Sequence, residues 1–251
     1  MGRSAPYRYF QLFNESMSYN QFAWYYDSLM EPQFYLDYFH FINRQTTYHQ
    51  VLELGCGTGS LAVLLADRAS QIDATDISEE MLAIAAKKHP HAHIRYQQLD
   101  MCKLDCQENY DLVLCLCDSL NYVKGLTAQL DVLHRAYQAL KPGGTLIFDV
   151  NSMHKLEVTQ KDYREEQEDE DFYFYWHSYR SDVHELSHLV VIEDLNSDER
   201  MEEKQTQYVY ELKDYLAGLQ KLSWQSIAYY SDFERYDPQK DRIQFVCRKE
   251  G

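Results

Sequence analysis

Three glycines at alternate positions give this sequence its first indication of chemistry. Gly55, Gly57 and Gly59 lie in the stretch VLELGCGTGS at positions 51–60, directly after a short apolar segment. Glycine is needed where the backbone takes a positive φ angle, or where it lies against a ligand with no side chain in between. The stretch therefore predicts a turn that a nucleotide-like molecule approaches closely.

The glycine spacing and one carboxylate narrow the kind of ligand. A dinucleotide-binding turn has the pattern G-x-G-x-x-G, but here the third glycine comes one residue early, at Gly59, and Ser60 stands in its place. Glu53, just before the first glycine, would repel a pyrophosphate and attract a cation. A cationic nucleoside such as S-adenosylmethionine fits this pattern better than NAD, although a nicotinamide-dependent oxidoreductase remains an alternative.

The stretch resembles the first motif of the class I S-adenosylmethionine-dependent methyltransferases, and later residues follow in the matching order. Asp76 lies about twenty positions after the glycines, where an acidic residue accepts hydrogen bonds from both ribose hydroxyls. The resemblance implies that Asp100 takes the adenine amino group while the backbone N–H of Met101 meets the ring. Tyr26, in a Tyr-Asp pair, is expected to cover the methionine end of the cofactor. The remaining cofactor-binding residues that the resemblance implies are Glu53, Gly55, Cys56, Gly57, Gly59, Ile77 and Cys117.

Polar residues after the most apolar strand are candidates for the acceptor site. The run from Tyr110 to Cys117 is nearly continuous in apolar residues, as in a strand buried on both faces. Carboxyl ends of parallel strands face the ligand crevice, so we expect Asp118, Asn121 and Tyr122 to position the acceptor. His177 is a further candidate, as a proton acceptor.

The resemblance extends to one group within the class. The phrase CDSLNY at positions 117–122 resembles the YqeM-type bacterial small-molecule methyltransferases, and the match runs in order from about Tyr19 to Lys249. The motifs of enzymes that methylate base amino groups or cytosine C5 are absent. The resemblance implies a small-molecule acceptor, and a non-catalytic S-adenosylmethionine-binding protein remains an alternative.

The elements that must position these residues follow an α/β alternation. Strands are predicted at 51–54, 71–75, 94–97, 110–117 and 145–150, and helices at 19–41, 61–68, 126–140 and 210–220. The resemblance implies a Rossmann-like seven-stranded sheet that is closed by an antiparallel strand pair at 222–230 and 242–248. The fold class expected is therefore α/β, with a mostly antiparallel β insertion.

The composition changes after residue 150 and sets the expected domain boundaries. Aromatic-rich alternating segments at 172–179 and 183–193 predict antiparallel strands that cover the acceptor site. The acidic run at 165–171 is interpreted as a solvated loop, with steering of a cationic acceptor as the alternative, and Trp176, His177 and Tyr179 line either the pocket or the insertion's own core. We expect a tail or extension at 1–16, a cofactor-binding core at 17–150, the insertion at 151–210 and closing elements at 211–251.

Charge and cysteine usage restrict the partners. The formal net charge of −16 disfavours nucleic acid as a partner. The apolar runs are too short to span a bilayer, so we expect a cytoplasmic protein that has no membrane segment. The six scattered cysteines and the histidines at 89, 91 and 93 predict neither a disulfide framework nor a metal site. The oligomeric state stays open.

Overall fold

A computed structural model describes residues 32–168, 170, 172–196 and 200–251 of the chain. The expected tail at 1–16, the first part of the predicted aromatic helix and Tyr26 lie outside the described residues. Helix α2 (Pro32–Gln45) overlaps the second part of that prediction and continues past the predicted end at residue 41. Within the described part of the chain, no helix is long and apolar enough to cross a membrane.

The central sheet has the topology that the α/β alternation predicts. Its strands are β1 (Gln50–Leu54), β2 (Gln71–Asp76), β3 (Ile94–Gln98), β4 (Tyr110–Cys115), β5 (Leu140–Asn151), β10 (Trp224–Ser231), β11 (Glu234–Arg235) and β12 (Arg242–Lys249). They lie in the order β3-β2-β1-β4-β5-β12-β10-β11, so the expected seven strands are extended by the two-residue β11. The first five are parallel, and β12 is antiparallel to both β5 and β10.

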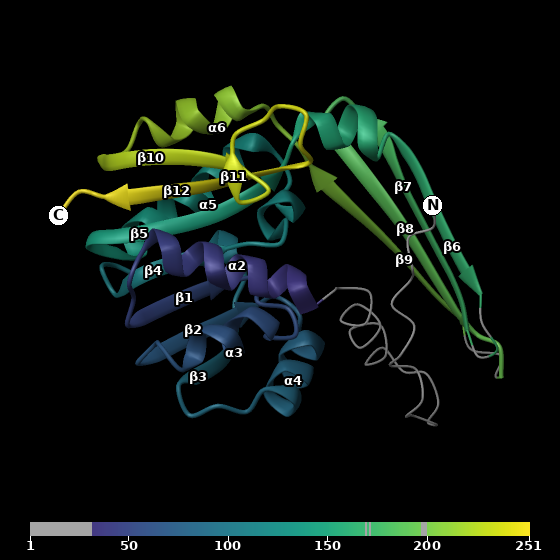
Figure 1. Cartoon of the computed structure of the whole chain (residues 1–251), viewed down its shortest axis with the longest axis horizontal. Coiled ribbons are helices and arrows are strands. Elements are labelled where there is room, and N and C mark those ends of the chain that lie inside the picture. Colours follow the sequence, from purple (N-terminus) through teal and green to yellow (C-terminus); the bar gives the residue numbers. More distant parts are fainter. Residues whose placement is uncertain (1–31, 169, 171, 197–199) are drawn as a thin grey trace.

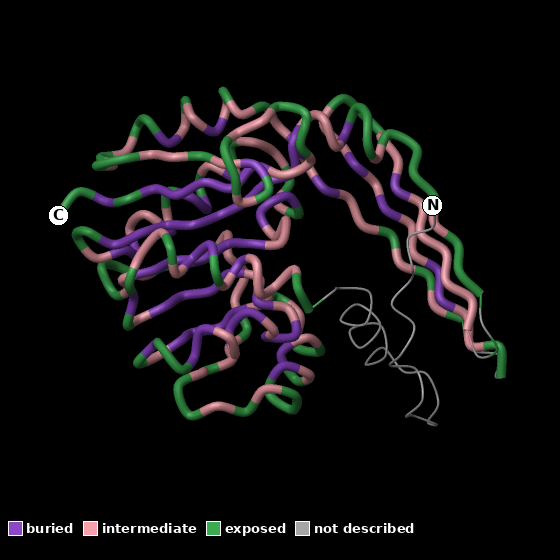
Figure 2. The backbone as a smooth tube through the Cα atoms, viewed as in Figure 1, coloured by how far each residue is buried: buried purple, intermediate pink, exposed green. Residues whose placement is uncertain are grey.

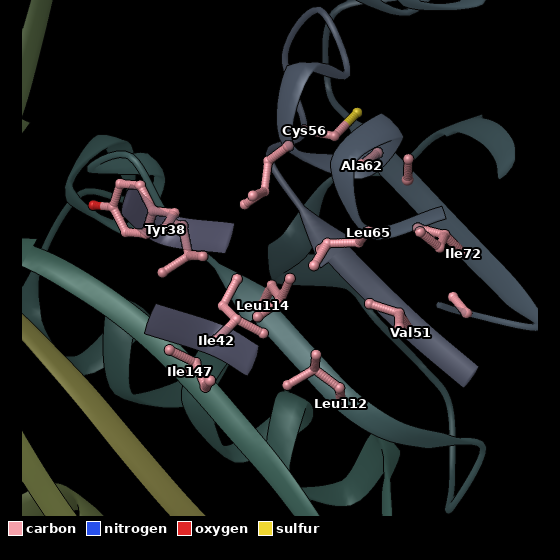
Figure 3. Packing of buried hydrophobic residues seen from close by; sticks show 14 of the residues in the cluster. Tyr38, Ile42, Val51, Cys56, Ala62, Leu65, Ile72, Leu112, Leu114 and Ile147 are labelled. Atoms are coloured by element: carbon pink, nitrogen blue, oxygen red, sulfur yellow. The ribbon is translucent and has the colours of Figure 1, made fainter. Parts of the chain in front are cut away.

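Helices cover both faces of this sheet (Figure 1). They are α3 (Ser60–Ala66), α4 (Glu79–Lys88), α5 (Leu126–Ala139) and α6 (Leu212–Leu219), with short helical turns η1 (Met101–Lys103), η2 (Ser119–Tyr122) and η3 (Lys155–Thr159). Helices α2, α3 and α4 pack on one face, where Tyr38, Ile42 and Leu65 belong to one buried apolar cluster with Val51 and Leu112 of the sheet (Figure 3). Helices α5 and α6 cover the other face. Burial is therefore concentrated in the middle strands, as Figure 2 shows.

The insertion forms a second sheet that stands beside one end of the central sheet (Figure 1). It consists of the antiparallel strands β6 (Asp162–Glu168), β7 (Phe172–Asp182), β8 (Glu185–Asp194) and β9 (Arg200–Tyr208), in that order. Side chains alternate between its two faces. Ile192 and Phe174 pack with Met81 of α4, so the face that carries them, which we call the inner face, lies toward the central domain.

Two segments differ from the sequence-based expectation. Most of the acidic run at 165–171 is not a loop, because residues 165–168 belong to strand β6, which pairs with β7 along its length. An edge strand tolerates this charge, since its side chains reach solvent while the backbone bonds to one neighbour only. Strand β5 begins at Leu140 rather than residue 145, and the glycine pair at 143–144 lies within it.

Candidate functional site

The glycine turn between β1 and α3 forms one wall of the site. Gly55, Gly57 and Gly59 have φ angles of 74°, 55° and 79°, a region that favours glycine because it lacks a Cβ. The backbone N–H groups of Gly55 and Cys56 donate to the carbonyl oxygen of Thr75 at 2.8 and 2.9 Å. These bonds fix the turn at the carboxyl end of β2.

The three glycines differ in what surrounds them. A Cβ on Gly55 would lie 2.5 Å from the hydroxyl oxygen of Ser119, and one on Gly59 would lie 2.8 Å from that of Tyr96. A Cβ on Gly57 would meet no described atom within 4 Å. Packing thus explains two glycines, and the third leaves open space where a ligand can reach the backbone.

We expect Gly57→Ala to weaken cofactor binding far more than it weakens the fold. The left-handed backbone costs an alanine about 1 kcal/mol, and no described atom occupies the space for the new methyl group. That methyl group would occupy the path of the ligand, so the Kd for S-adenosylhomocysteine should rise by at least about tenfold, or 1.4 kcal/mol.

Gly59→Ala is the matched control, because there the methyl group meets Tyr96 and should lower the melting temperature more than Gly57→Ala does. Calorimetric titration and thermal unfolding of both variants measure the two effects. Wild-type affinity in a folded Gly57→Ala protein would contradict the assignment of this space to the ligand.

Asp76 joins the glycine turn to the end of β2. Its Oδ2 accepts from the backbone N–H of Gly57 at 2.9 Å, and its Oδ1 accepts from that of Ser78 at 2.9 Å. An ionised carboxylate has about four acceptor positions, so two remain for hydroxyl groups of a ribose. Ile77, beside it, exposes 66% of its surface and offers an apolar contact.

Glu53 is a buried carboxyl group with an unused acceptor. Only 4% of its surface is exposed, and its Oε2 has no hydrogen-bond partner among the described residues. Burial, assisted by the charge of Asp76, raises the pKa of Glu53 to about 8. A cationic group bound here would satisfy this carboxyl, so the residue fits the ligand predicted from the sequence.

Asp100 and Met101 open the short turn η1 after β3. The Oδ1 atom of Asp100 accepts from the backbone N–H of Cys102 at 2.9 Å, and this bond lowers the pKa of Asp100. The Cε atom of Met101 lies 3.7 Å from the position of a Cβ on Gly55. The structure thus brings Met101 to the glycine turn, although the sequence separates the two by more than forty residues.

The turn after β4 has an unusual backbone. Cys117 and Asp118 have φ angles of 57° and 63°, which side chains disfavour. Asp149 on β5 holds the turn in place, because its carboxylate accepts from the N–H groups of Cys117 at 3.0 Å and Asp118 at 2.8 Å. Cys117 thus lies at the carboxyl ends of the parallel strands, as the glycine turn does.

Asp118 belongs to a buried charge network that the sequence reasoning missed. Its carboxylate pairs with Arg242 at 2.6 Å and with Lys155 at 3.4 Å. Arg242 also donates to the hydroxyl group of Tyr38 at 2.7 Å, and Tyr38 bonds to Asp149. Burial alone would raise the pKa of Asp118, but Arg242 and Lys155 outweigh it and hold this pKa below its usual value.

Asp149 is the second carboxyl of this network, and its pKa is shifted in the opposite direction. Burial raises the pKa of Asp149 by more than Arg242 lowers it, and the charge of Asp118 adds to the rise. Both carboxyls interact electrostatically with the guanidinium group of Arg242, the first residue of β12, which forms its ion pair with Asp118. Asp118 positions the turn through this network rather than standing free toward an acceptor.

Asn121 and Tyr122 connect the turn to the insertion. Asn121 is completely buried, and its amide donates to the carbonyl of Tyr208 at 2.8 Å and accepts from the N–H of Asn151 at 2.8 Å. The hydroxyl of Tyr122 donates to Oε1 of Gln205 on β9 at 2.8 Å. Tyr122 exposes 46% of its surface, so it can meet a ligand, whereas Asn121 holds the scaffold.

The inner face carries a histidine that the sequence reasoning did not single out. The indole N–H of Trp176 donates to Nδ1 of His188 at 3.3 Å, so Nε2 carries the proton toward Oε1 of Gln207 at 3.1 Å. Burial lowers the pKa of His188 to about 4, and the ring is therefore neutral at neutral pH.

His177, the predicted proton acceptor, lies on the opposite face of the same sheet. It follows Trp176 directly on β7, so its side chain alternates to the outer face and pairs with Asp162 at 2.8 Å. Tyr179 lies on that outer face as well, with its ring 4.7 Å from that of His177. Of the three predicted lining residues, only Trp176 faces the central domain.

Within the described ranges, no group of three or more His, Cys, Asp or Glu side chains is arranged to hold a metal ion. All six cysteines are free. Burial raises the thiol pKa of Cys56 and Cys117, so both thiols are uncharged at neutral pH. What the site offers a cofactor is therefore backbone groups, carboxylates and apolar contacts.

Comparisons with known proteins agree on one family. A family model described as a methyltransferase domain matches residues 51–144. A putative methyltransferase from Geobacillus sp. (strain WCH70) is 32% identical over 248 residues, which cover 93% of this chain and 100% of that protein. Putative methyltransferase YqeM of Bacillus subtilis (strain 168) is 30% identical, with 93% and 98% covered. A solved S-adenosylmethionine-dependent methyltransferase from Clostridium acetobutylicum has a TM-score of 0.80 and 25% identity, with 93% and 99% covered.

Proposed function

Because this chain belongs to the S-adenosylmethionine-dependent methyltransferase family, we propose that it methylates a small molecule held between the end of β4 and the inner face of the insertion. S-adenosylmethionine is the cofactor and supplies a methyl group bonded to a positively charged sulfur. In-line transfer of this group mainly requires alignment of the two reactants and exclusion of water. The proposed reaction class is EC 2.1.1.

The contact between Tyr122 and Gln205 carries this proposal. Tyr122 follows β4 at the carboxyl ends of the parallel strands, where the glycine turn also lies, and Gln205 lies on the inner face of the insertion. Their 2.8 Å hydrogen bond therefore joins the proposed cofactor site to the insertion. Residues 151–210 would act as the acceptor cover, with 211–251 completing the cofactor-binding core.

The proposed division of labour follows from burial and contacts. The acceptor would contact Tyr122, Gln205 and Trp176. Two further residues, Asp118 and Asn121, would hold the turn after β4 in place without touching the acceptor. The cofactor would lie against the residues that surround the glycine turn and the ends of β2, β3 and β4. These are Glu53, Gly55, Cys56, Gly57, Gly59, Asp76, Ile77, Asp100, Met101 and Cys117.

We also propose that the enzyme works in the cytoplasm. Its six free cysteines support this location, because reducing compartments preserve thiols. The acidic net charge of −16 supports a small molecule over nucleic acid as the acceptor.

Transfer of a labelled methyl group tests the proposed function. Purified protein is incubated with methyl-labelled S-adenosylmethionine and a bacterial extract that has been separated by size. We expect label in the small-molecule fraction, and far less with the Asp76→Ala variant when the cofactor concentration is near the wild-type Kd. Label only in protein or nucleic acid would contradict a small-molecule acceptor, and no transfer to any fraction would favour a non-catalytic binding protein.

Once an acceptor is identified, we expect Gln205→Ala to raise the KM for that acceptor by about tenfold. Loss of one hydrogen bond that contributes about 1.4 kcal/mol gives a factor of this size. The Kd for S-adenosylhomocysteine should stay unchanged, because Gln205 lies on the insertion. Thr206→Ala is the control, since Thr206 is the next residue on β9 and points to the other face. Steady-state kinetics at saturating cofactor measure both variants, and equal KM values in the two would contradict the role of Gln205.

A further inference from the structure

We propose that Glu53 carries a proton in the free protein and releases it when the sulfonium cation of S-adenosylmethionine binds, so that Glu53 discriminates the methyl donor from its uncharged-sulfur product. This role rests on the proposed function and goes beyond simple contact with the cofactor. It assigns to one carboxyl group the preference for S-adenosylmethionine over S-adenosylhomocysteine.

The position of Glu53 makes an isolated negative charge unfavourable. On β1 it lies between Ala74 of β2 and Leu114 of β4, both of them buried and apolar. Its Oε2 has no partner within the described part of the chain. Burial of an unpaired carboxylate costs several kcal/mol in proteins, and a group in this situation becomes neutral instead.

Among the residues that the structure describes, the groups that interact with Glu53 supply no compensating positive charge. Electrostatic interactions link it to Asp76 on β2, Cys56 in the glycine turn, Tyr96 on β3, and Cys115 and Cys117 at the end of β4. All of these are acidic or neutral side chains. Burial and Asp76 therefore raise the pKa of Glu53 to about 8, and the carboxyl is mostly protonated at pH 7.

A cation bound beside Glu53 would favour the ionised carboxylate over the protonated carboxyl. A positive charge within a few ångströms favours the ionised carboxylate, because Coulomb attraction is strong where water is excluded. In methyl transfer the acceptor's lone pair forms the new bond to carbon, the carbon–sulfur bond breaks, and its electron pair stays on sulfur as an uncharged thioether. The positive charge passes to the acceptor, which becomes neutral again by releasing a proton to solvent. Glu53 then loses a positive partner and takes up a proton from solvent, which weakens binding of the product relative to the donor.

Proton release on binding tests this role without any turnover. Wild type and Glu53→Gln are titrated calorimetrically with S-adenosylmethionine at pH 7, in two buffers of different ionisation enthalpy. We expect wild type to release about 0.9 proton more than the variant, as a free pKa of about 8 requires. Ionisation of the ligand's own groups occurs with both proteins, so the difference between them isolates Glu53. The difference should be clearly smaller with S-adenosylhomocysteine.

The pH dependence of wild type alone gives a second measurement if the variant does not fold. The Kd for S-adenosylmethionine should fall by about tenfold from pH 6 to pH 7 and level off above pH 8, while the Kd for S-adenosylhomocysteine changes less. A constant ratio of the two affinities, or equal proton release by wild type and variant, would overturn the role of Glu53 and leave the proposed function intact. Failure of wild type to bind S-adenosylmethionine would overturn both.

Discussion

Asp76→Ala is expected to raise the Kd for S-adenosylhomocysteine by at least about 100-fold. The substitution removes a charged acceptor for the ribose hydroxyls and also the bond that holds the N–H of Gly57 at 2.9 Å. A hydrogen bond to a charged group contributes about 1.5–3 kcal/mol, and two tenfold steps amount to about 2.7 kcal/mol. Calorimetric titration measures the loss.

Asp73→Asn is a matched control for this prediction. Asp73 is a second carboxylate on β2, but it pairs with Arg95 at 3.0 Å and with the hydroxyl of Tyr110 at 2.7 Å. We expect this variant to bind S-adenosylhomocysteine as wild type does. Wild-type affinity in a folded Asp76→Ala protein would show that the ribose lies elsewhere.

Arg242→Met is expected to destabilise the protein by about 3–5 kcal/mol, the usual effect of removing one partner from a buried ion pair. Asp118 and Asp149 would then lie buried near Tyr38, and Lys155 would be the one cation still paired with Asp118 among the described residues. For a domain of this size the melting temperature should fall by about 10 °C. Thermal unfolding followed by circular dichroism measures the change.

Two further variants test whether the loss of stability comes from the unpaired buried carboxylates. Arg248→Met changes another arginine of β12, whose guanidinium bonds to the carbonyl of Gln45 in an exposed position, and should cost less than about 0.5 kcal/mol. The double variant Arg242→Met with Asp118→Asn removes a stranded charge and should recover part of the lost stability. An unchanged melting temperature in Arg242→Met would mean that the network does not support the turn.

Hydrophobic patterning made most of the fold predictable. The apolar run that begins at Tyr110 predicts β4, because a strand covered on both faces has no side exposed to water and consists mainly of apolar residues. The position of Asp76 at the end of β2 could be predicted as well, since that strand ends where the pattern indicates. The family resemblance drawn from these motifs is confirmed by the comparisons, which favour neither the nicotinamide-dependent alternative nor a different fold.

The face of a strand was harder to predict than the strand itself. Side chains alternate with a period of two, so a shift of one residue exchanges the inner and outer faces. The pattern of β7 is aromatic on both faces, and His177 and Trp176 were therefore indistinguishable from sequence. The inner-face histidine, His188, sits on the neighbouring strand, and only the pairing of β7 with β8 reveals it.

The buried charge network had no local signal at all. Arg242 is separated from Tyr38 by 204 positions, and no periodicity or motif relates residues so far apart. The pairing of β12 with β5 places Arg242 opposite Asn151, and the packing of α2 on the sheet brings Tyr38 to it. A single arginine at the start of a strand gives no sequence cue that it will pair with a turn after β4.

Calorimetric titration of the purified protein with S-adenosylhomocysteine and, separately, with NADH is the most direct test of the cofactor site. The glycine turn, with Glu53 before it and Asp76 at its side, predicts binding of S-adenosylhomocysteine alone. Binding of NADH, or of neither ligand, would contradict the assignment of this site to a methyl donor.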